Sequence, residues 1–178
     1  MNRRALPPLL GALLLAACPT VDGEPTPDGP AVDLGTGELD FEPLDDGDEL
    51  AIVLGSQGGY HLYGSFRSHG VVAGDSRSLT EPTNPTMEFD VVHDGASIIA
   101  IPPFTQGIAE APAEQAPWTH WMLGREARLV LAFGDDVTLD GESVDFSITV
   151  TDTDGTVVQD TVSVVLYPHA LNGQNAPG

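Results

Sequence analysis

Positive charge is scarce in this sequence. It contains no lysine and only six arginines against 27 aspartates and glutamates, so the 178-residue chain carries a formal charge of −21 at pH 7. A surface this acidic repels the phosphate backbone of nucleic acids. We therefore predict no nucleic acid partner, and we expect the folded part to stand away from an anionic lipid surface.

Cysteine and the common catalytic motifs are also lacking. Cys18 is the only cysteine, which excludes a disulfide within the chain. The sequence has no Gly-x-Ser-x-Gly segment, no Gly-Lys-Ser/Thr end of a phosphate-binding loop, and no histidine pair at the spacing of a zinc-binding helix. These absences predict a protein that is not an enzyme.

Cys18 ends an amino-terminal segment with the pattern of an export signal. Arg3 and Arg4 precede an apolar run over residues 5–17, which is too short for the roughly 30 Å hydrocarbon core of a membrane. The run closes on Leu-Ala-Ala-Cys, which resembles the lipobox of bacterial lipoproteins. The resemblance implies cleavage before Cys18 and a lipid on its thiol. The protein would then be anchored to a membrane of the bacterial cell envelope, facing the periplasm or the cell exterior.

Composition divides the rest of the chain into three parts. Residues 18–47 are acidic and rich in proline and glycine, with too few apolar side chains to offset the entropy of ordering them, so we predict a disordered tether. Residues 48–170 hold the apolar runs of a folded domain, and we predict a disordered tail over residues 171–178. The signal peptide of residues 1–17 completes the division.

The folded part shows the alternation of β-strands. Val144, Phe146, Ile148 and Val150 alternate with polar residues, which is the pattern of a half-buried strand. No segment has a convincing helical stripe. The candidate strands are residues 49–54, 60–66, 86–92, 97–101, 128–133, 144–150 and 156–166. These strands and the turn residues between them predict an all-β, antiparallel sandwich.

Two segments resemble known families. The hairpin of residues 144–166, which turns at Asp154-Gly155, resembles the last two strands of bacterial immunoglobulin-like and PKD-type extracellular domains. That resemblance implies a single immunoglobulin-like β-sandwich of about seven strands. Residues 55–61, followed by Arg67 and Gly70, are similar to a pattern in small uncharacterised bacterial lipoproteins, which implies no particular activity.

A glycine pair marks the first candidate ligand-binding segment. Gly58 and Gly59 would let a ligand approach the backbone closely, with polar contacts from Gln57 and His61. The same glycines are also what a tight turn or a bulge requires. Both interpretations stay open at the level of sequence.

An aromatic pair marks the second candidate. The long irregular stretch of residues 102–119 is followed by Trp121, and Trp118, His120 and Trp121 together could bind a sugar or an apolar side chain of a partner. The alternative is that the two tryptophans pack against the core and an edge of the sandwich.

Carboxylates and histidines are the candidate metal ligands. A calcium loop is suggested by Asp152 and Asp154, which are followed by Gly155. The glutamate of a complete EF-hand is missing, and the same residues also form simple turns. The five histidines are candidate zinc or copper ligands without a close-spaced motif. Calcium is therefore the one cofactor that the sequence suggests.

These observations together predict a lipid-anchored protein of the cell envelope. We expect a non-catalytic binding or structural module that recognises a protein or a glycan. The alternative is an envelope domain that binds a metal, either calcium or histidine-bound zinc or copper.

Overall fold

The computed structural model describes residues 27–56, 58–131 and 135–172, and these residues form an all-β domain. They contain eleven strands and two short 3₁₀ helices, but no α-helix, and none of their helices is long and apolar enough to cross a membrane. The elements are β1 (Ala31–Thr36), β2 (Glu42–Pro43), β3 (Glu49–Leu54), β4 (Tyr60–His69), β5 (Thr86–His93), β6 (Ala96–Ser97), β7 (Phe104–Thr105), β8 (Ala109–Glu110), η1 (Ala113–Gln115), β9 (His120–Arg128), η2 (Asp135–Leu139), β10 (Ser143–Thr151) and β11 (Val157–Pro168).

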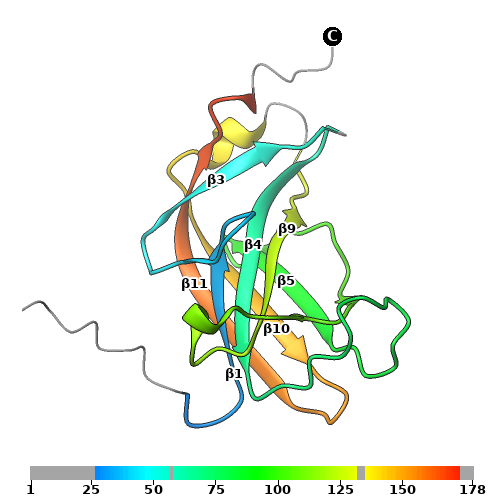
Figure 1. The fold of residues 1–178 in the computed structure, drawn as a ribbon. Coiled ribbons are helices and arrows are strands. Elements are labelled where there is room, and N and C mark those ends of the chain that lie inside the picture. The colour runs from blue at the N-terminus through cyan, green and yellow to red at the C-terminus, as the bar shows by residue number, and fades with distance from the viewer. Residues whose placement is uncertain (1–26, 57, 132–134, 173–178) are drawn as a thin grey trace, which may run out of the picture.

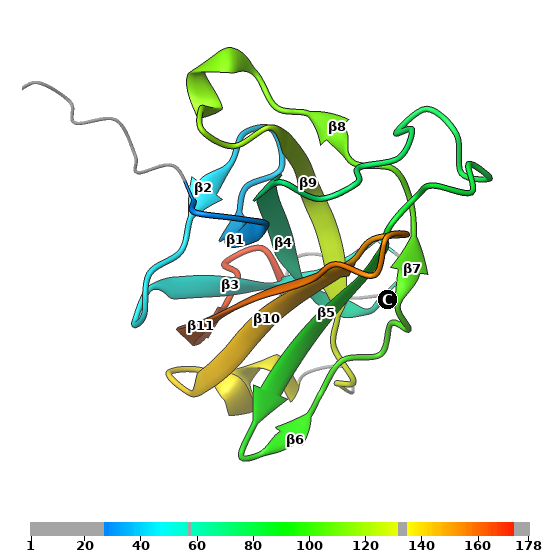
Figure 2. The ribbon, with the colours of Figure 1, turned by 90° about the horizontal axis from the view of Figure 1, so that it is seen from below.

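The strands form two layers of a sandwich (Figures 1 and 2). One layer contains β2, β1, β4, β9 and β8, and the other contains β11, β10, β5, β6 and β7. Strand β3 belongs to both layers, because Val53 pairs with His61 of β4 while Leu50 pairs with Leu166 of β11. The prediction of an all-β sandwich is confirmed, and its strand pairs are antiparallel except for the parallel β3–β11 pair, which makes the sheet mixed.

The core fills the space between the two layers. Phe146 of β10 and Phe89 of β5 stack with their ring centres 5.8 Å apart, and Phe66 of β4 reaches them from the opposite layer. Gly64 of β4 makes this contact possible, since a Cβ atom there would lie 2.6 Å from the Phe89 ring. The alternating side chains of β10 supply the inner face that the sequence predicted, and Phe146, Ile148 and Val150 are fully buried.

Two of the seven predicted strands are wrong in their bounds. Residues 97–101 contribute only the end of β6 and a single bridge between Ile99 and Leu129. Of the strand predicted at 128–133, Arg128 is the last residue of β9, and residues 132 and 133 lie outside the described residues. Most of β9 has no recognisable strand pattern in the sequence. A bulge shifts the β4–β9 register between Gly64 and Phe66 of β4, and this breaks the two-residue alternation of side chains along β9.

The folded domain begins earlier than predicted. Residues 31–47 were expected to be part of the disordered tether, but β1 pairs with β4 over five residues and Leu34 is fully buried. The Leu34 amide donates a hydrogen bond of 2.8 Å to the Asp160 carboxylate of β11. The boundary at residue 47 is therefore wrong, while residues 18–26 and the signal peptide lie outside the described residues.

The folded domain also ends later than residue 170. Asn172 is buried, and its side-chain amide donates to the Ile52 carbonyl and to the Asp136 carboxylate, both at 2.8 Å. Its side-chain oxygen accepts a hydrogen bond from the Leu54 amide at 2.9 Å. The last described residue is thus fixed to β3 and η2, and only residues 173–178 of the predicted tail lie outside the described residues.

Candidate functional site

Strand β9 has one edge that is only partly paired. Its other edge follows β4 along nearly its whole length. On the partly paired edge, Trp121 pairs with Ala109 of β8, and beyond the end of the strand Leu129 bridges to Ile99. Between these two points the chain of residues 101–107 leaves β9 and joins β5 through β7 (Figure 2).

Residues 101–107 leave β9 because two prolines interrupt the hydrogen-bonded ladder. The Val130 amide donates to the Ile98 carbonyl at 2.8 Å, and the Ala100 amide donates to the Arg128 carbonyl at 2.7 Å. In this register Pro102 is the next residue to face β9, opposite Glu126. Proline has no amide hydrogen to donate, and Pro103 follows it, so the ladder cannot continue.

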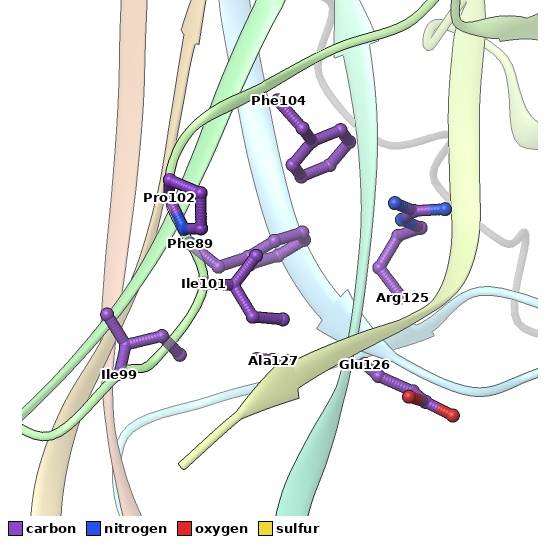
Figure 3. Close-up of a pocket in the computed structure, with 8 residues that line it drawn as sticks. All are labelled: Phe89, Ile99, Ile101, Pro102, Phe104, Arg125, Glu126 and Ala127. Atoms are coloured by element: carbon purple, nitrogen blue, oxygen red, sulfur yellow. The ribbon is translucent and has the colours of Figure 1, made fainter. Parts of the chain in front are cut away.

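An apolar cavity lies where the ladder opens (Figure 3). It has a volume of about 60 Å³, and Figure 3 shows Ile101 and the Phe104 ring facing across it toward β9. We call this cavity, with the β9 backbone beside it, the β9-edge groove. Its lining residues are Phe89, Ile99, Ile101, Pro102, Phe104, Arg125, Glu126 and Ala127.

Arg125 is the only basic side chain that lines the β9-edge groove. Its guanidinium lies 4.5 Å from the centre of the Phe104 ring, while the neighbouring Glu126 side chain points away from the cavity (Figure 3). Among the described residues neither Arg125 nor Arg128 has an ion-pair partner, whereas Arg67 pairs with Asp33 at 2.7 Å and Arg77 with Asp75 at 3.2 Å; of the two unpaired arginines, Arg125 is the one that lines the apolar cavity. A cation without a carboxylate partner is notable in a chain with 27 acidic residues.

Trp121 lies next to this groove. It lines a shallower polar and apolar hollow that it shares with Met122 and Arg125 of β9 and with Ala109 of β8. The Arg125 side chain therefore separates the hollow from the apolar cavity. Of the residues that the sequence singled out, Trp121 is the one that the structure places beside the β9-edge groove.

Trp118 has a packing role instead. It is buried, and its ring lies 5.0 Å from the Arg67 guanidinium. The Phe41 ring contacts the same guanidinium at 4.6 Å. Asp33 holds the same guanidinium at 2.7 Å. Trp118 thus packs against the Arg67 side chain of β4.

His120 faces a different surface from Trp121, because successive side chains of a strand point to opposite sides. It lies opposite Glu110 in a polar depression whose far wall is the loop after β4. Burial lowers the pKa of His120 below its ordinary value, against the opposing effect of the Glu110 carboxylate. The structure therefore does not gather Trp118, His120 and Trp121 into one aromatic site.

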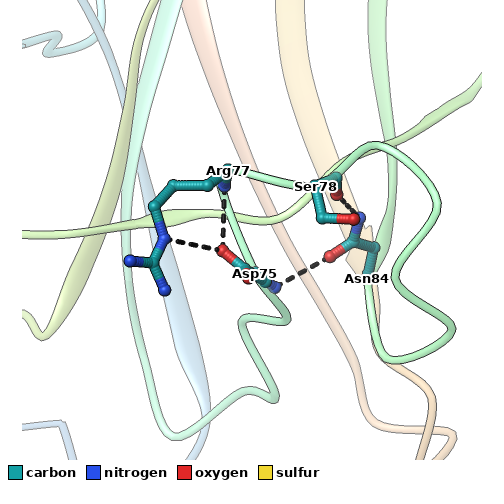
Figure 4. Close-up of polar contacts among 4 residues, drawn as sticks. All are labelled: Asp75, Arg77, Ser78 and Asn84. Carbon is teal, nitrogen blue, oxygen red and sulfur yellow. Dashed lines mark hydrogen bonds and ion pairs between the residues drawn. The ribbon is translucent and has the colours of Figure 1, made fainter.

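The loop that forms this wall is held by its own polar side chains (Figure 4). The Asn84 side chain accepts a hydrogen bond from the Asp75 amide at 2.9 Å and donates one to the Ser78 carbonyl at 2.7 Å. The Asp75 carboxylate accepts hydrogen bonds from the Arg77 amide and guanidinium at 2.9 and 3.2 Å. These contacts hold the side chains of Asp75 and Asn84 within the loop.

His61 lies beside a separate polar pocket of about 70 Å³. The pocket is formed by the Gly55–Gly59 turn together with Glu126 and Arg128 of β9, while Gln57 lies outside the described residues. The His61 side chain is buried and packs edge-on against the Tyr63 ring at 4.8 Å, and its Nε2 has no hydrogen-bond partner among the described residues. A Cβ atom at position 55 would lie 3.3 Å from the imidazole, so the glycine leaves room for the turn to lie close to His61.

We expect His61 to make the domain sensitive to acid. Burial lowers the pKa of folded His61 below 6.5, so the unfolded chain binds more protons in the interval beneath that value, and stability falls as pH drops through it. Between about pH 7 and pH 5, the melting temperature of His61→Gln should therefore fall by less than that of the wild type. An equal decline in both proteins would contradict this role for His61.

Asp152 organises a turn. One of its carboxylate oxygens accepts hydrogen bonds from the Asp154 and Thr156 amides at 3.0 and 2.9 Å, and the other accepts one from the Val72 amide at 2.9 Å. These hydrogen bonds lower the pKa of Asp152, although its burial acts in the opposite direction. They occupy three of the roughly four acceptor sites of the carboxylate, and the described residues contain no group of three histidine, aspartate or glutamate side chains that could hold a metal.

The comparisons with known proteins leave the family open. No family model matches the chain, and no curated protein matches it. Among solved structures it is similar to CopC from Methylosinus trichosporium OB3b, with 15% identity and a TM-score of 0.30 over 70% of this chain and 87% of that chain.

Proposed function

We propose that this protein is a non-catalytic binding module of the bacterial cell envelope, and that it holds an apolar group with a neighbouring carboxylate in the β9-edge groove. One observation carries this proposal: Arg125 stands at an apolar cavity without a carboxylate partner among the described residues. The proposal favours a protein partner over a glycan, because an apolar cavity suits a side chain better than a sugar hydroxyl.

The chemistry of Arg125 favours a carboxylate in particular. A guanidinium presents a planar fork of donors that matches the two oxygens of a carboxylate. The Phe104 ring beneath it holds the guanidinium at 4.5 Å and leaves its donors available. The apolar walls keep water away from one side of the pair, which strengthens the attraction.

The location of the module rests on the amino-terminal segment. Cys18 lies outside the described residues, so the lipid anchor is a proposal from the lipobox alone. With the domain beginning near Ala31, a spacer of about a dozen residues separates it from Cys18. Fully extended, that spacer reaches about 40 Å, so the module would stay close to its membrane.

Binding of 4-methylpentanoate tests the function that we propose. This small acid combines an apolar group and a carboxylate, and we expect it to shift the backbone NMR signals of Phe104, Arg125 and Ala127. Arg125→Gln should weaken the binding about tenfold or more, since a hydrogen bond to a charged group contributes about 1.5–3 kcal/mol.

Arg77→Gln is the matched control for this titration. The Arg77 side chain is 89% exposed and already paired with Asp75, so its loss should leave the affinity unchanged. Equal weakening by both substitutions would show a general charge effect, and unperturbed groove signals in the wild type would reject the β9-edge groove as the site.

Replacement of Cys18 tests the anchor. Cys18→Ala removes the thiol that would carry the lipid, so the protein should move from the membrane fraction to the soluble fraction. Cell fractionation followed by immunoblotting measures this, with the wild type as the reference. Unchanged partitioning into the membrane fraction would reject the lipid anchor.

A further inference from the structure

The backbone of Glu126 points into the β9-edge groove. The Leu129 amide donates to the Tyr60 carbonyl at 2.8 Å, so Leu129 and Tyr60 form a hydrogen-bonded pair of the antiparallel β4–β9 ladder. Such pairs alternate with pairs whose backbone groups face the other way. Arg128 and Glu126 belong to the second kind, and the Arg128 carbonyl does point away from β4, since it accepts from Ala100.

The Glu126 carbonyl lacks the donor that this ladder would have supplied. The register that joins Ala100 to Arg128 places Pro102 opposite Glu126, and proline has no amide hydrogen. Within the described residues, the ladder between this segment and β9 stops at Ala100. An acceptor of the main chain is thus available beside the apolar cavity and Arg125.

Three complementary groups therefore meet at one place: a cation, an apolar cavity and a carbonyl that lacks a donor. We propose that the β9-edge groove binds the carboxy-terminal residue of a peptide or protein chain. This inference rests on the proposed function and names its ligand class. The terminal carboxylate pairs with Arg125, the apolar side chain enters the cavity, and the amide of the same residue donates to the Glu126 carbonyl.

The size of the cavity limits the terminal side chain. A volume of about 60 Å³ is small for a ligand site, since pockets for whole small molecules hold about 300–1,000 Å³. That space suits a short branched aliphatic side chain, such as that of valine or leucine, and is too small for an indole. Apart from Arg125 and Glu126, the lining side chains are apolar and offer no hydrogen bond to a polar terminal residue.

N-acetyl-L-leucine is the probe that separates this inference from the proposed function. It adds to 4-methylpentanoate the acylated amide of a terminal residue. We expect it to bind about three- to tenfold more tightly in an NMR or calorimetric titration, which is the worth of one further hydrogen bond. N-acetyl-L-leucinamide, which lacks the carboxylate, should bind at least tenfold more weakly than N-acetyl-L-leucine.

Pro102→Ala tests the role of the Glu126 carbonyl. Alanine restores an amide at position 102 that can donate to Glu126, so N-acetyl-L-leucine should lose its advantage over 4-methylpentanoate when both acids are titrated against this same variant. Pro103→Ala is the control, because residue 103 faces away from β9 in this register and should preserve the advantage.

The outcomes separate the two proposals. Equal affinities of the two acids for the wild type, or an advantage that survives Pro102→Ala, would overturn the assignment of a carboxy-terminal residue and leave the proposed function standing. The absence of binding by either acid at the β9-edge groove would overturn both. An advantage that is lost in Pro102→Ala and retained in Pro103→Ala supports the assignment.

Discussion

We expect Phe146→Asp to abolish the cooperative unfolding transition of the domain. Phe146 is fully buried on β10 and stacks on Phe89, with Gly64 of the opposite layer close against the ring. An aspartate there buries a charge without a partner, which costs several kcal/mol. The lost ring contacts add about 3–5 kcal/mol, and the total approaches the 5–15 kcal/mol that stabilises a typical domain.

Thermal melts followed by circular dichroism measure this effect. Thr151→Asp is the matched control, because Thr151 lies on the same strand but is exposed. The control should retain a cooperative melt within a few degrees of the wild type. A cooperative melt of Phe146→Asp at the wild-type temperature would show that the inner face of β10 is assigned wrongly.

Removal of the segment before Asp48 should also prevent folding. A chain that begins at Pro27 keeps β1 and should unfold cooperatively, whereas a chain that begins at Asp48 loses four buried apolar side chains. Each buried side chain of this kind contributes about 1.5–3 kcal/mol, so the loss is comparable to the whole stability of the domain. The four are Val32, Leu34, Phe41 and Leu44.

Urea unfolding of the two chains checks this prediction. A single substitution measures the contribution of β1 without removing the whole segment. Leu34→Ala in the longer chain should cost about 2–5 kcal/mol, because Leu34 is fully buried in the core. An unfolding midpoint of the Asp48 chain equal to that of the Pro27 chain would show that β1 is dispensable and that the predicted boundary was adequate.

The fold was predictable where a strand buries one face in a regular period. Residues 144–150 alternate without interruption, so β10 was identified correctly. Strand β1 has the same alternation in Val32 and Leu34, but only two apolar positions stand out from an acidic and glycine-rich background. Its role becomes visible only when β4 and β11 are placed around it, which is information that a local pattern does not contain.

The candidate site was less predictable than the fold. Trp121 was singled out by its aromatic character, and the long irregular segment before it does form one wall of the β9-edge groove. Arg125 was missed because its lack of a carboxylate partner depends on which acids lie nearby in space. The available signal was Pro102-Pro103 directly after an apolar run, since two consecutive prolines end a strand ladder.

The path of the chain through β4 has a mechanical consequence. The polypeptide enters the domain at Ala31, which pairs with His69 at one end of β4, while Arg125 and Ala127 pair with Gly64 and Leu62 toward the other end. A force that pulls between the amino-terminal side and the β9-edge groove therefore acts along β4. Because interstrand hydrogen bonds are perpendicular to the strands, this load shears the β1–β4 bonds together instead of opening them one at a time. The domain is thus built to resist tension between its entry point and the groove.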